Sequence, residues 1–357
     1  MEREIDPKAM GAKQAMISGY AIGAHVSGMI FLGLEMGLYD ALRDAGASTS
    51  AELANATGLH ERWIREWLYG QASARVLEYD SATKQFTVSP EVWALLGDPD
   101  ELRSMRSNFA GLTYRFGVLD RAPESFRTGL GTPWDDRGPR AAEMTELLFR
   151  NWYRRVLVPV VLPMLGGVVD ALRGGGRAAD IGCGTGIAMI EMATAFPAGD
   201  FHGYETSLQA IERGREHASA AGVTNVTFHD ANVDPLPDAP TFDFITTFDC
   251  LHDMTHPHEA AEAIRAAIKP SGTWFIADIN GGADFEANLS RPLSPLFYAI
   301  SVMSCMSSAL SAEGGAGYGT LGLPEPEMRK LVERAGFMQF RRVDLTHPVN
   351  AFYEAQI

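Results

Sequence analysis

The segment ADIGCGTG, residues 179–186, decides the fold of the larger part of this chain. It follows a strand-like run that begins at residue 177, and its glycines are Gly182, Gly184 and Gly186. Glycine permits a tight turn and lets a ligand approach the backbone, while the amides at the start of a following helix point toward that ligand. The segment therefore predicts a ligand-binding turn between a first strand and its helix.

Strand-like and helical runs alternate after this turn. The strand-like runs are RAADIG, DFHGYE, NVTFHDA, FDFITTFD and GTWFIADI, separated by helical stretches such as SLQAIERGREHASAAG. This alternation predicts an α/β fold with a parallel sheet covered by helices on both faces. The last two runs, FMQFRRVDL and NAFYEAQI, predict a terminal antiparallel hairpin.

Further candidates for the site stand where the predicted strands end. Glu205 closes the second strand about twenty residues after the turn, where a carboxylate can accept both ribose hydroxyls of a nucleoside. Thr206 and Gln209 predict a capping box on the next helix. Asp230 and Phe248 close the third and fourth strands. Because ligands of such sheets bind at the carboxyl ends of the strands, we expect one site there.

The glycine turn distinguishes between two nucleotide cofactors. A nicotinamide site of the G-x-G-x-x-G type has glycine or alanine where this chain has Ile187. The form D-x-G-x-G-x-G instead resembles motif I of class I S-adenosylmethionine-dependent methyltransferases. Over residues 177–357 the resemblance implies a Rossmann-like seven-stranded methyltransferase sheet that uses S-adenosylmethionine. The cofactor-binding residues it implies are Asp180, Gly182, Cys183, Gly184, Gly186, Glu205, Thr206, Asp230, Ala231 and Phe248.

The segment FDCLHDMTHPH, residues 248–258, holds the candidate base. His252 directly follows the fourth strand, at the edge of the sheet where ligands bind. A histidine that titrates near neutrality can take the proton of a hydroxyl, which is a poor nucleophile while neutral. Lining the cofactor without proton transfer is the alternative role. His256 and His258 flank a helix start without the H-E-x-x-H spacing, so we expect no metal.

The LHDM segment, residues 251–254, resembles the small-molecule O-methyltransferases of plant phenolic and bacterial polyketide pathways. The winged-helix pattern of residues 29–96 and the helical connector after it add to this resemblance. In that family a His-Asp-Trp segment carries the base. The resemblance implies His252 as the base, Asp278 as its orienting partner and Asp253 beside the substrate. Met254 replaces the family's tryptophan, and a second family glutamate is missing near Gly322, which puts the catalytic pairing in doubt.

Residues 283–320 form a long insertion before the last helix. Phe297 and Met303 in this insertion, with Tyr153 from an earlier helix, are candidates for an apolar wall around the substrate. Such stripes also pack ordinary cores, so burial without ligand contact is the alternative. If the wall exists, the methyl acceptor is at least partly apolar.

Residues 29–96 read as helical segments followed by a short hairpin around DSATK, which is typical of a winged helix. Such modules bind DNA through basic residues, yet acidic side chains outnumber basic ones between residues 29 and 91. We therefore predict a homodimerisation role and no nucleic-acid binding. The acidic residues are Glu35, Asp40, Asp44, Glu52, Glu61, Glu66, Glu78, Asp80 and Glu91, and the basic ones are Arg43, Arg62, Arg65, Arg75 and Lys84.

The net charge and composition of the chain also argue against binding to nucleic acid or membranes. The 357 residues carry a net charge of −15, which repels nucleic acid and anionic lipid. Three widely spaced cysteines and a charged N-terminus predict a reducing, cytoplasmic setting. The apolar stretch 14–34 contains four glycines, two serines and a histidine, so we expect a helix buried in an interface and no membrane span.

We thus expect a winged-helix dimerisation domain at 1–97, a helical connector that contributes to the substrate cleft at 98–170, and a methyltransferase domain at 171–357. The expected reaction moves a methyl group from S-adenosylmethionine to a hydroxyl oxygen of a small, partly apolar molecule. Two alternatives remain open: methyl transfer to nitrogen, carbon or sulfur without the histidine base, and a transcriptional regulator that senses S-adenosylmethionine.

Overall fold

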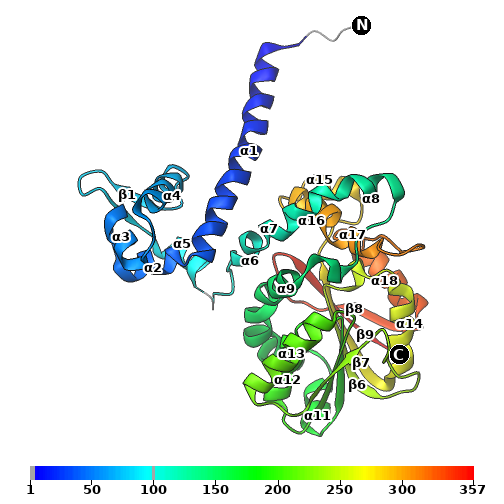
Figure 1. Cartoon of the computed structure of the whole chain (residues 1–357). Helices are drawn as coiled ribbons and strands as arrows, with labels where there is room; N and C mark the ends of the chain where they lie inside the picture. The colour runs from blue at the N-terminus through cyan, green and yellow to red at the C-terminus, as the bar shows by residue number, and fades with distance from the viewer. Residues whose placement is uncertain (1–4, 99–100) are drawn as a thin grey trace. The chain divides into compact units, whose positions relative to one another are not determined.

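The computed structural model describes residues 5–98 and 101–357, and the chain divides into two compact units, Met1–Thr113 and Tyr114–Ile357 (Figure 1). The predicted boundary segment at 97–104 includes residues 99 and 100, which lie outside the described residues. The division into three domains at 97/98 and 170/171 stays a prediction.

The N-terminal unit is a helical domain with a two-stranded hairpin. A capping box starts its helix-turn-helix, because the Thr49 amide donates to the Glu52 carboxylate at 2.7 Å and the Thr49 side chain accepts from the Glu52 amide. The predicted wing is confirmed by the antiparallel pairing of β1 with β2. The main elements are α1 (Pro7–Glu35), α2 (Leu38–Ala45), α3 (Ser50–Thr57), α4 (Glu61–Ser73), β1 (Glu78–Asp80), β2 (Gln85–Thr87) and α6 (Arg106–Ala110).

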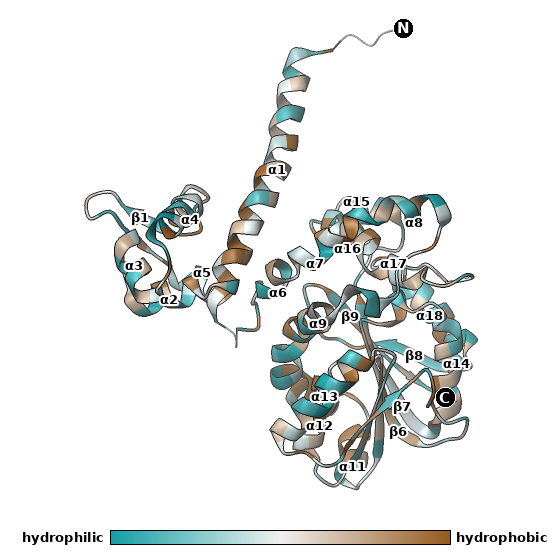
Figure 2. Cartoon of the chain, in the orientation of Figure 1, coloured by the Kyte–Doolittle hydropathy of each residue, from teal (hydrophilic) through white to brown (hydrophobic). Residues whose placement is uncertain are grey.

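Helix α1 packs on this domain only through its C-terminal part. The Trp67 indole donates to the Met29 carbonyl at 2.9 Å, which ties α4 to α1. Toward the N-terminus α1 exposes apolar side chains, including Ile17, Tyr20 and Ile22. Figure 2 shows hydrophobic residues recurring along this helix. By length and composition alone, α1 is the one helix of the described residues that could cross a membrane. Exposed apolar surface of this kind is typical of an interaction site.

The C-terminal unit contains a seven-stranded sheet in the order β5-β4-β3-β6-β7-β9-β8, which confirms the predicted sheet. The first five strands along the chain run parallel, and β9 lies antiparallel to both β7 and β8, as the terminal hairpin predicted. The strands are β3 (Arg177–Ile181), β4 (Asp200–Glu205), β5 (Val226–Asp230), β6 (Phe242–Phe248), β7 (Ile268–Ile279), β8 (Gln339–Arg342) and β9 (Asn350–Gln356).

Helices cover both faces of this sheet, and each face buries its own apolar cluster (Figure 1). One cluster joins the sheet to the helices α11 (Val168–Arg173) and α12 (Ile187–Ala195), and α13 (Leu208–Ala221) covers the same side. The other joins the sheet to α14 (Pro257–Ala267) and α18 (Glu325–Arg334). Burying both faces explains why these strands read as nearly continuous apolar runs.

Further helical segments surround the carboxyl ends of the strands. They matter here because several of them contribute side chains to a cavity. These segments are α7 (Leu112–Gly117), α8 (Ala122–Thr128), η3 (Trp134–Arg137), α9 (Pro139–Trp152), η4 (Tyr153–Val161), η5 (Leu251–Asp253), α15 (Phe285–Leu289), α16 (Ser294–Met303) and α17 (Cys305–Ala309).

Candidate active site

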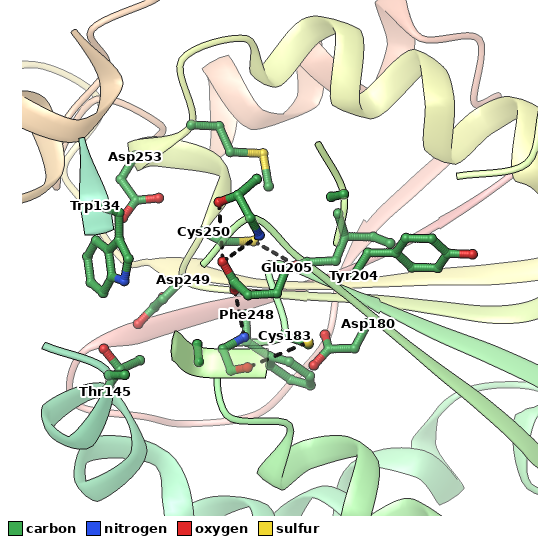
Figure 3. Close-up of a pocket in the computed structure, with 18 of the residues that line it drawn as sticks. Trp134, Thr145, Asp180, Cys183, Tyr204, Glu205, Phe248, Asp249, Cys250 and Asp253 are labelled. Carbon is green, nitrogen blue, oxygen red and sulfur yellow. Dashed lines mark hydrogen bonds between the residues drawn. The ribbon is translucent and has the colours of Figure 1, made fainter. Parts of the chain in front are cut away.

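A cavity of about 570 Å³ opens at the carboxyl ends of β3, β4 and β6 (Figure 3). This volume lies within the range of small-molecule sites, and open α/β sheets bind ligands at this edge. The cavity wall comes from the glycine turn, the strand ends, η3, α9, η4, η5 and the residues around α17. The cavity is therefore the candidate active site.

The glycine turn after β3 has the backbone that its sequence requires. Gly182, Gly184 and Gly186 all have positive φ angles, between 54° and 71°. A Cβ on Gly186 would lie 2.3 Å from the Phe228 ring, whereas a Cβ on Gly184 would meet nothing within 4 Å. Gly184 thus leaves open space on the cavity wall, which fits close approach of a ligand to the backbone.

Glu205 ties the glycine turn to the end of β4. Its Oε2 accepts from the Gly184 amide at 2.8 Å, and its Oε1 accepts from the Thr206 amide at 2.8 Å and the Ser207 amide at 3.0 Å. The predicted capping box of Thr206 and Gln209 is wrong, because Ser207 is the N-cap of α13 and accepts from the Ala210 amide. Thr206 instead donates its hydroxyl to Glu205, and both residues line the cavity.

Asp180 is 2% exposed and lies on the cavity wall beside the glycine turn. Its Oδ1 accepts from the Thr246 hydroxyl at 2.7 Å. Burial raises the pKa of Asp180 to about 8, with Glu205 adding to the rise and the Thr246 hydrogen bond opposing it. A positively charged ligand nearby would favour the ionised form. Cys183 lines the cavity as well.

The residues at the end of β5, the third predicted strand, contribute to the cavity differently from the prediction. Asp230 is not among the residues that line the cavity; its Oδ1 accepts from the amide and the side chain of Asn232, at 3.0 and 2.9 Å. Ala231 and Asn232 do line the cavity. The carboxylate of Asp230 thus shapes the loop that presents its neighbours, and a binding role for Asp230 itself stays a prediction. The only sequence signal for Asn232 is that it is a polar residue just beyond the end of a predicted strand.

Aromatic side chains form one wall. Phe248 and Tyr153 line the cavity, with their ring centroids 5.0 Å apart in an edge-to-face contact. Burial raises the pKa of Tyr153 well above its ordinary value, and the carboxyls of Asp180 and Asp249 raise it further. Phe149 and Trp134 add to the same cavity. The wall is apolar but lies within electrostatic reach of two acids.

The structure brings His252 and Asp278 together, since Nδ1 of His252 lies 2.7 Å from Oδ1 of Asp278. Both are almost fully buried, and neither is among the residues that line the cavity. Burial by itself would lower the pKa of His252, but Asp278 and the Cys305 thiol outweigh burial and raise it well above its ordinary value. Asp278 therefore favours the imidazolium form of His252.

Asp249, which the sequence analysis did not single out, lies on the cavity wall between Phe248 and His252 in the chain. Its φ of 48° is in the left-handed region, and Asn350 on β9 donates a hydrogen bond to its Oδ1. Burial raises the pKa of Asp249 to about 8, with Asp278 contributing to the rise. No spacing rule marks this residue, because its significance depends on contacts with β7 and β9.

The predicted substrate residues are divided between two places. Asp253 and Tyr153 line the cavity. Phe297 is 9% exposed and packs with Ile279 and Leu321 in a separate small cluster, and Met303 is also absent from the cavity wall. The insertion contributes Ser308 and Ser311 to the wall instead, from α17 and just after it. A substrate role for Phe297 and Met303 stays a prediction.

One group of side chains in the described part of the chain has donor atoms close enough to hold a metal ion. The donor atoms of His252, Asp253 and Cys305 lie within 4.8 Å of one another. His258 is separate from this group, and its Nε2 lies 3.1 Å from the Tyr318 hydroxyl. The expectation of no metal stays a prediction.

Comparison with known proteins assigns both parts of the chain. Residues 172–309 match the family model of a methyltransferase domain. The chain thus carries a methyltransferase domain, as its glycine turn and sheet predicted. Residues 24–97 match the model of the Rv2258c-like winged HTH domain. The chain therefore carries that winged helix ahead of the methyltransferase domain.

The relatives are O-methyltransferases. A ubiquinone biosynthesis O-methyltransferase of Neisseria meningitidis is 33% identical over 127 residues, or 34% of this chain and 51% of the relative. The mitomycin biosynthesis 6-O-methyltransferase of Streptomyces lavendulae is 26% identical over 193 residues, or 53% of this chain and 55% of the relative. The chain thus spans about half the length of these curated relatives.

Solved structures share the whole fold. The mitomycin 7-O-methyltransferase MmcR has a TM-score of 0.68 at 20% identity and covers 99% of this chain and 100% of its own. Human N-acetylserotonin methyltransferase, solved in complex with S-adenosylmethionine, has a TM-score of 0.70 at 18% identity and covers 100% of this chain and 99% of its own. At these identities the likeness concerns the fold alone.

Proposed function

We propose that this protein transfers a methyl group from S-adenosylmethionine to a hydroxyl oxygen of a small, partly apolar molecule. The observation that carries the proposal is the cavity at the carboxyl ends of β3, β4 and β6, where the Glu205 carboxylate accepts a hydrogen bond from the Gly184 amide of the glycine turn. A methyltransferase domain with such a turn presents backbone and carboxylate groups to a nucleoside.

The charge of the cavity supports a cationic cofactor. No lysine or arginine is among its lining residues in the described part of the chain, whereas six acidic residues line it: Asp135, Glu146, Asp180, Glu205, Asp249 and Asp253. When bound, S-adenosylmethionine would supply a methyl group on a positively charged sulfur. Opposite charges attract more strongly in a partly buried site than in water, and a bound cation would also favour the ionised forms of Asp180 and Asp249, whose pKa values are raised. This wall therefore favours the charged cofactor over its neutral-sulfur product.

The acceptor would contact the aromatic wall. Trp134, Phe149, Tyr153 and Phe248 supply apolar surface, and Asp253 with the hydroxyls of the α17 region supplies polar contacts. Oxygen as the accepting atom is suggested by the relatives, which are named as O-methyltransferases. Nitrogen, carbon and sulfur acceptors remain the alternative.

The proposed base is His252 with Asp278 as its partner. The 2.7 Å contact between them orients the ring, as a histidine base requires. Because the pKa of His252 is raised, the imidazole would accept a proton only at alkaline pH or after its surroundings change. The rate should then rise with pH beyond neutrality if His252 is the base.

The proposed partner of the N-terminal domain is a second copy of this chain. The exposed apolar side chains of α1 would be buried in a homodimer, and the acidic surface of the domain argues against nucleic acid. A cytoplasmic location without membrane insertion is part of the same proposal.

The decisive experiment incubates the purified protein with methyl-labelled S-adenosylmethionine and a panel of phenols, amines and thiols, followed by mass spectrometry. Label on a phenolic oxygen supports the proposal. Label on an amine or thiol alone retires the oxygen assignment, and failure of calorimetry to detect binding of S-adenosylmethionine retires the proposed activity.

A further inference from the structure

Asp249 is held in an unusual conformation at the end of β6. Its φ of 48° lies in a region that residues other than glycine adopt rarely, although aspartate does so more often than most, and strained residues of this kind cluster at functional sites. Its amide donates to the Ala277 carbonyl at 2.8 Å, and Asn350 donates to its Oδ1. Two neighbouring strands, β7 and β9, thus fix the backbone and the carboxyl of this residue.

The carboxyl of Asp249 faces the cavity. Figure 3 shows it on the side of the cavity that carries Trp134 and Thr145, whereas Asp180 lies on the opposite side. Both carboxylate oxygens of Glu205 already accept bonds from backbone amides of the glycine turn and the start of α13. Asp249 is therefore an acid on the cavity wall away from the nucleoside-binding turn.

The surroundings of Asp249 determine its charge. Burial raises its pKa to about 8, the carboxyls of Asp278 and Asp253 add to the rise, and His252 and the Asn350 hydrogen bond oppose it. Unless a cation lies beside it, Asp249 is thus mostly protonated at neutral pH. The titratable and polar groups that face it are Asp278 on β7, His252 and Asp253 in η5, Asn350 on β9 and Tyr153 in η4.

His252 is less well placed to meet an acceptor first. It is 3% exposed, does not line the cavity and already shares a hydrogen bond with Asp278. A group that takes a proton directly must lie within hydrogen-bond reach of it. An acceptor in the cavity would reach the Asp249 carboxyl before the imidazole.

We propose that Asp249 receives the hydroxyl proton of the acceptor, and that binding of the cationic cofactor in the same cavity brings Asp249 into its carboxylate form. This rests on the proposed function and places Asp249 ahead of His252 on the route of the proton. In the transfer step the acceptor oxygen bonds to the methyl carbon as the carbon–sulfur bond breaks with its electron pair left on sulfur, and Asp249 takes the proton. Asp249 returns that proton to water when the next cation enters the cavity.

The test measures proton release on cofactor binding, which needs no acceptor and no turnover. Calorimetric titration of the whole protein with S-adenosylmethionine at pH 7, in buffers of different ionisation enthalpy, gives the number of protons released. A carboxyl with a pKa of about 8 that ionises fully on binding would release about 0.9 proton at this pH. Asp180 can release a proton as well, so the informative quantity is the difference between variants.

Asp249→Asn is the test variant, because asparagine tolerates a positive φ and keeps an oxygen for Asn350. We expect it to release fewer protons than the wild-type protein, by up to about 0.9, while binding S-adenosylmethionine within severalfold of the wild type. Asp238→Asn, at an exposed position, is the matched control and should leave proton release unchanged. Equal release from Asp249→Asn and the wild type overturns the proposal.

The second measurement is turnover once the labelling panel has supplied an acceptor. Asp249→Asn should lower kcat by roughly 100-fold or more, the usual contribution of a proton-transfer group, with a smaller effect on KM. Unchanged kcat in a variant that binds the cofactor rejects Asp249 while leaving the methyltransferase assignment intact. Wild-type protein that neither binds S-adenosylmethionine nor transfers label rejects the proposed function itself.

Discussion

The Gly184 amide donates a hydrogen bond of 2.8 Å to Oε2 of Glu205, so the turn after β3 and the end of β4 are joined at the carboxyl edge of the sheet. The same carboxylate accepts two more amides at the start of α13. One acidic side chain thus organises the backbone on both sides of the cavity, which makes it a sensitive position for cofactor binding.

Replacing Glu205 by glutamine should weaken binding of S-adenosylmethionine roughly 10- to 100-fold. Hydrogen bonds to a charged group contribute about 1.5–3 kcal/mol, and an amide group would turn a donor toward one of the backbone amides. Calorimetry measures the change. Glu212→Gln, an exposed position on α13, is the control, and equal affinities in the two variants would contradict the organising role.

Replacing Gly186 by alanine should destabilise the protein more than replacing Gly222 by alanine. Both glycines have φ near 70°, so both substitutions strain the backbone, but only the Cβ at 186 would collide with Phe228. We expect an additional loss of about 1–3 kcal/mol in the free energy of unfolding, typical of overpacking. Urea denaturation of the two variants gives this difference. Equal losses of unfolding free energy would show that the Phe228 ring moves aside at no cost in stability.

The stability of the protein should depend on the ionisation of Asp180. Its folded-state pKa of about 8 lies above the unfolded value of about 3.9, so the neutral form is favoured by folding. This contribution is fully present below the unfolded pKa and is lost as pH rises from about 4 to 8. Asp180→Asn should therefore gain in Tm relative to the wild type over that range. A constant Tm difference from pH 5 to pH 9 would exclude the raised pKa.

Replacing His252 by glutamine should lower kcat without weakening cofactor binding. The loss should be roughly 100-fold or more if the imidazole takes part in proton transfer, and Asp278→Asn should reproduce part of it through the lost orientation of the ring. Single-turnover rates with cofactor already bound measure the effect. Nearly full turnover by His252→Gln would favour the alternative that the acceptor atom needs no histidine.

Placing negative charges on the exposed N-terminal part of α1 should dissociate the proposed homodimer. Ile17→Glu together with Ile22→Glu places two carboxylates on apolar positions that are 61% and 63% exposed in the single chain. Light scattering coupled to size exclusion should report a dimer for the wild type and a monomer for this variant, with Lys13→Glu as the control. Flotation of the wild-type protein with lipid vesicles would instead assign the helix to a membrane.

Local sequence patterns were enough for the fold of the C-terminal unit. Apolar runs of strand length, broken by helical stretches, predicted the parallel sheet, because strands buried on both faces must be apolar throughout. Chain order also located the strand ends, so Glu205 and Phe248 were found on the cavity wall. The hairpin of β8 and β9 followed from the same reasoning.

Side-chain partners were harder to predict because they depend on atoms distant in sequence. The capping residue of α13 was misassigned by one position, since Thr206 and Ser207 are both competent caps and only the turn of the chain selects Ser207. The sequence predicted Asp230 as a ligand-binding acid, yet its carboxylate accepts hydrogen bonds from the amide and side chain of Asn232. Local hydrogen bonding by aspartate competes with any role at a distance.

By itself, then, the sequence determined the winged helix, the glycine turn and the strand order along the chain, because periodicity and chain order carry that information. The pairing of His252 with Asp278 came from the family resemblance of the LHDM segment. Only the tertiary structure decided which of these residues reach the cavity. Asp249 faces it because β7 and β9, which end at Ile279 and Gln356, fix its backbone and its carboxyl. His252 is turned inward to Asp278, because a buried imidazole is stabilised by a charged partner.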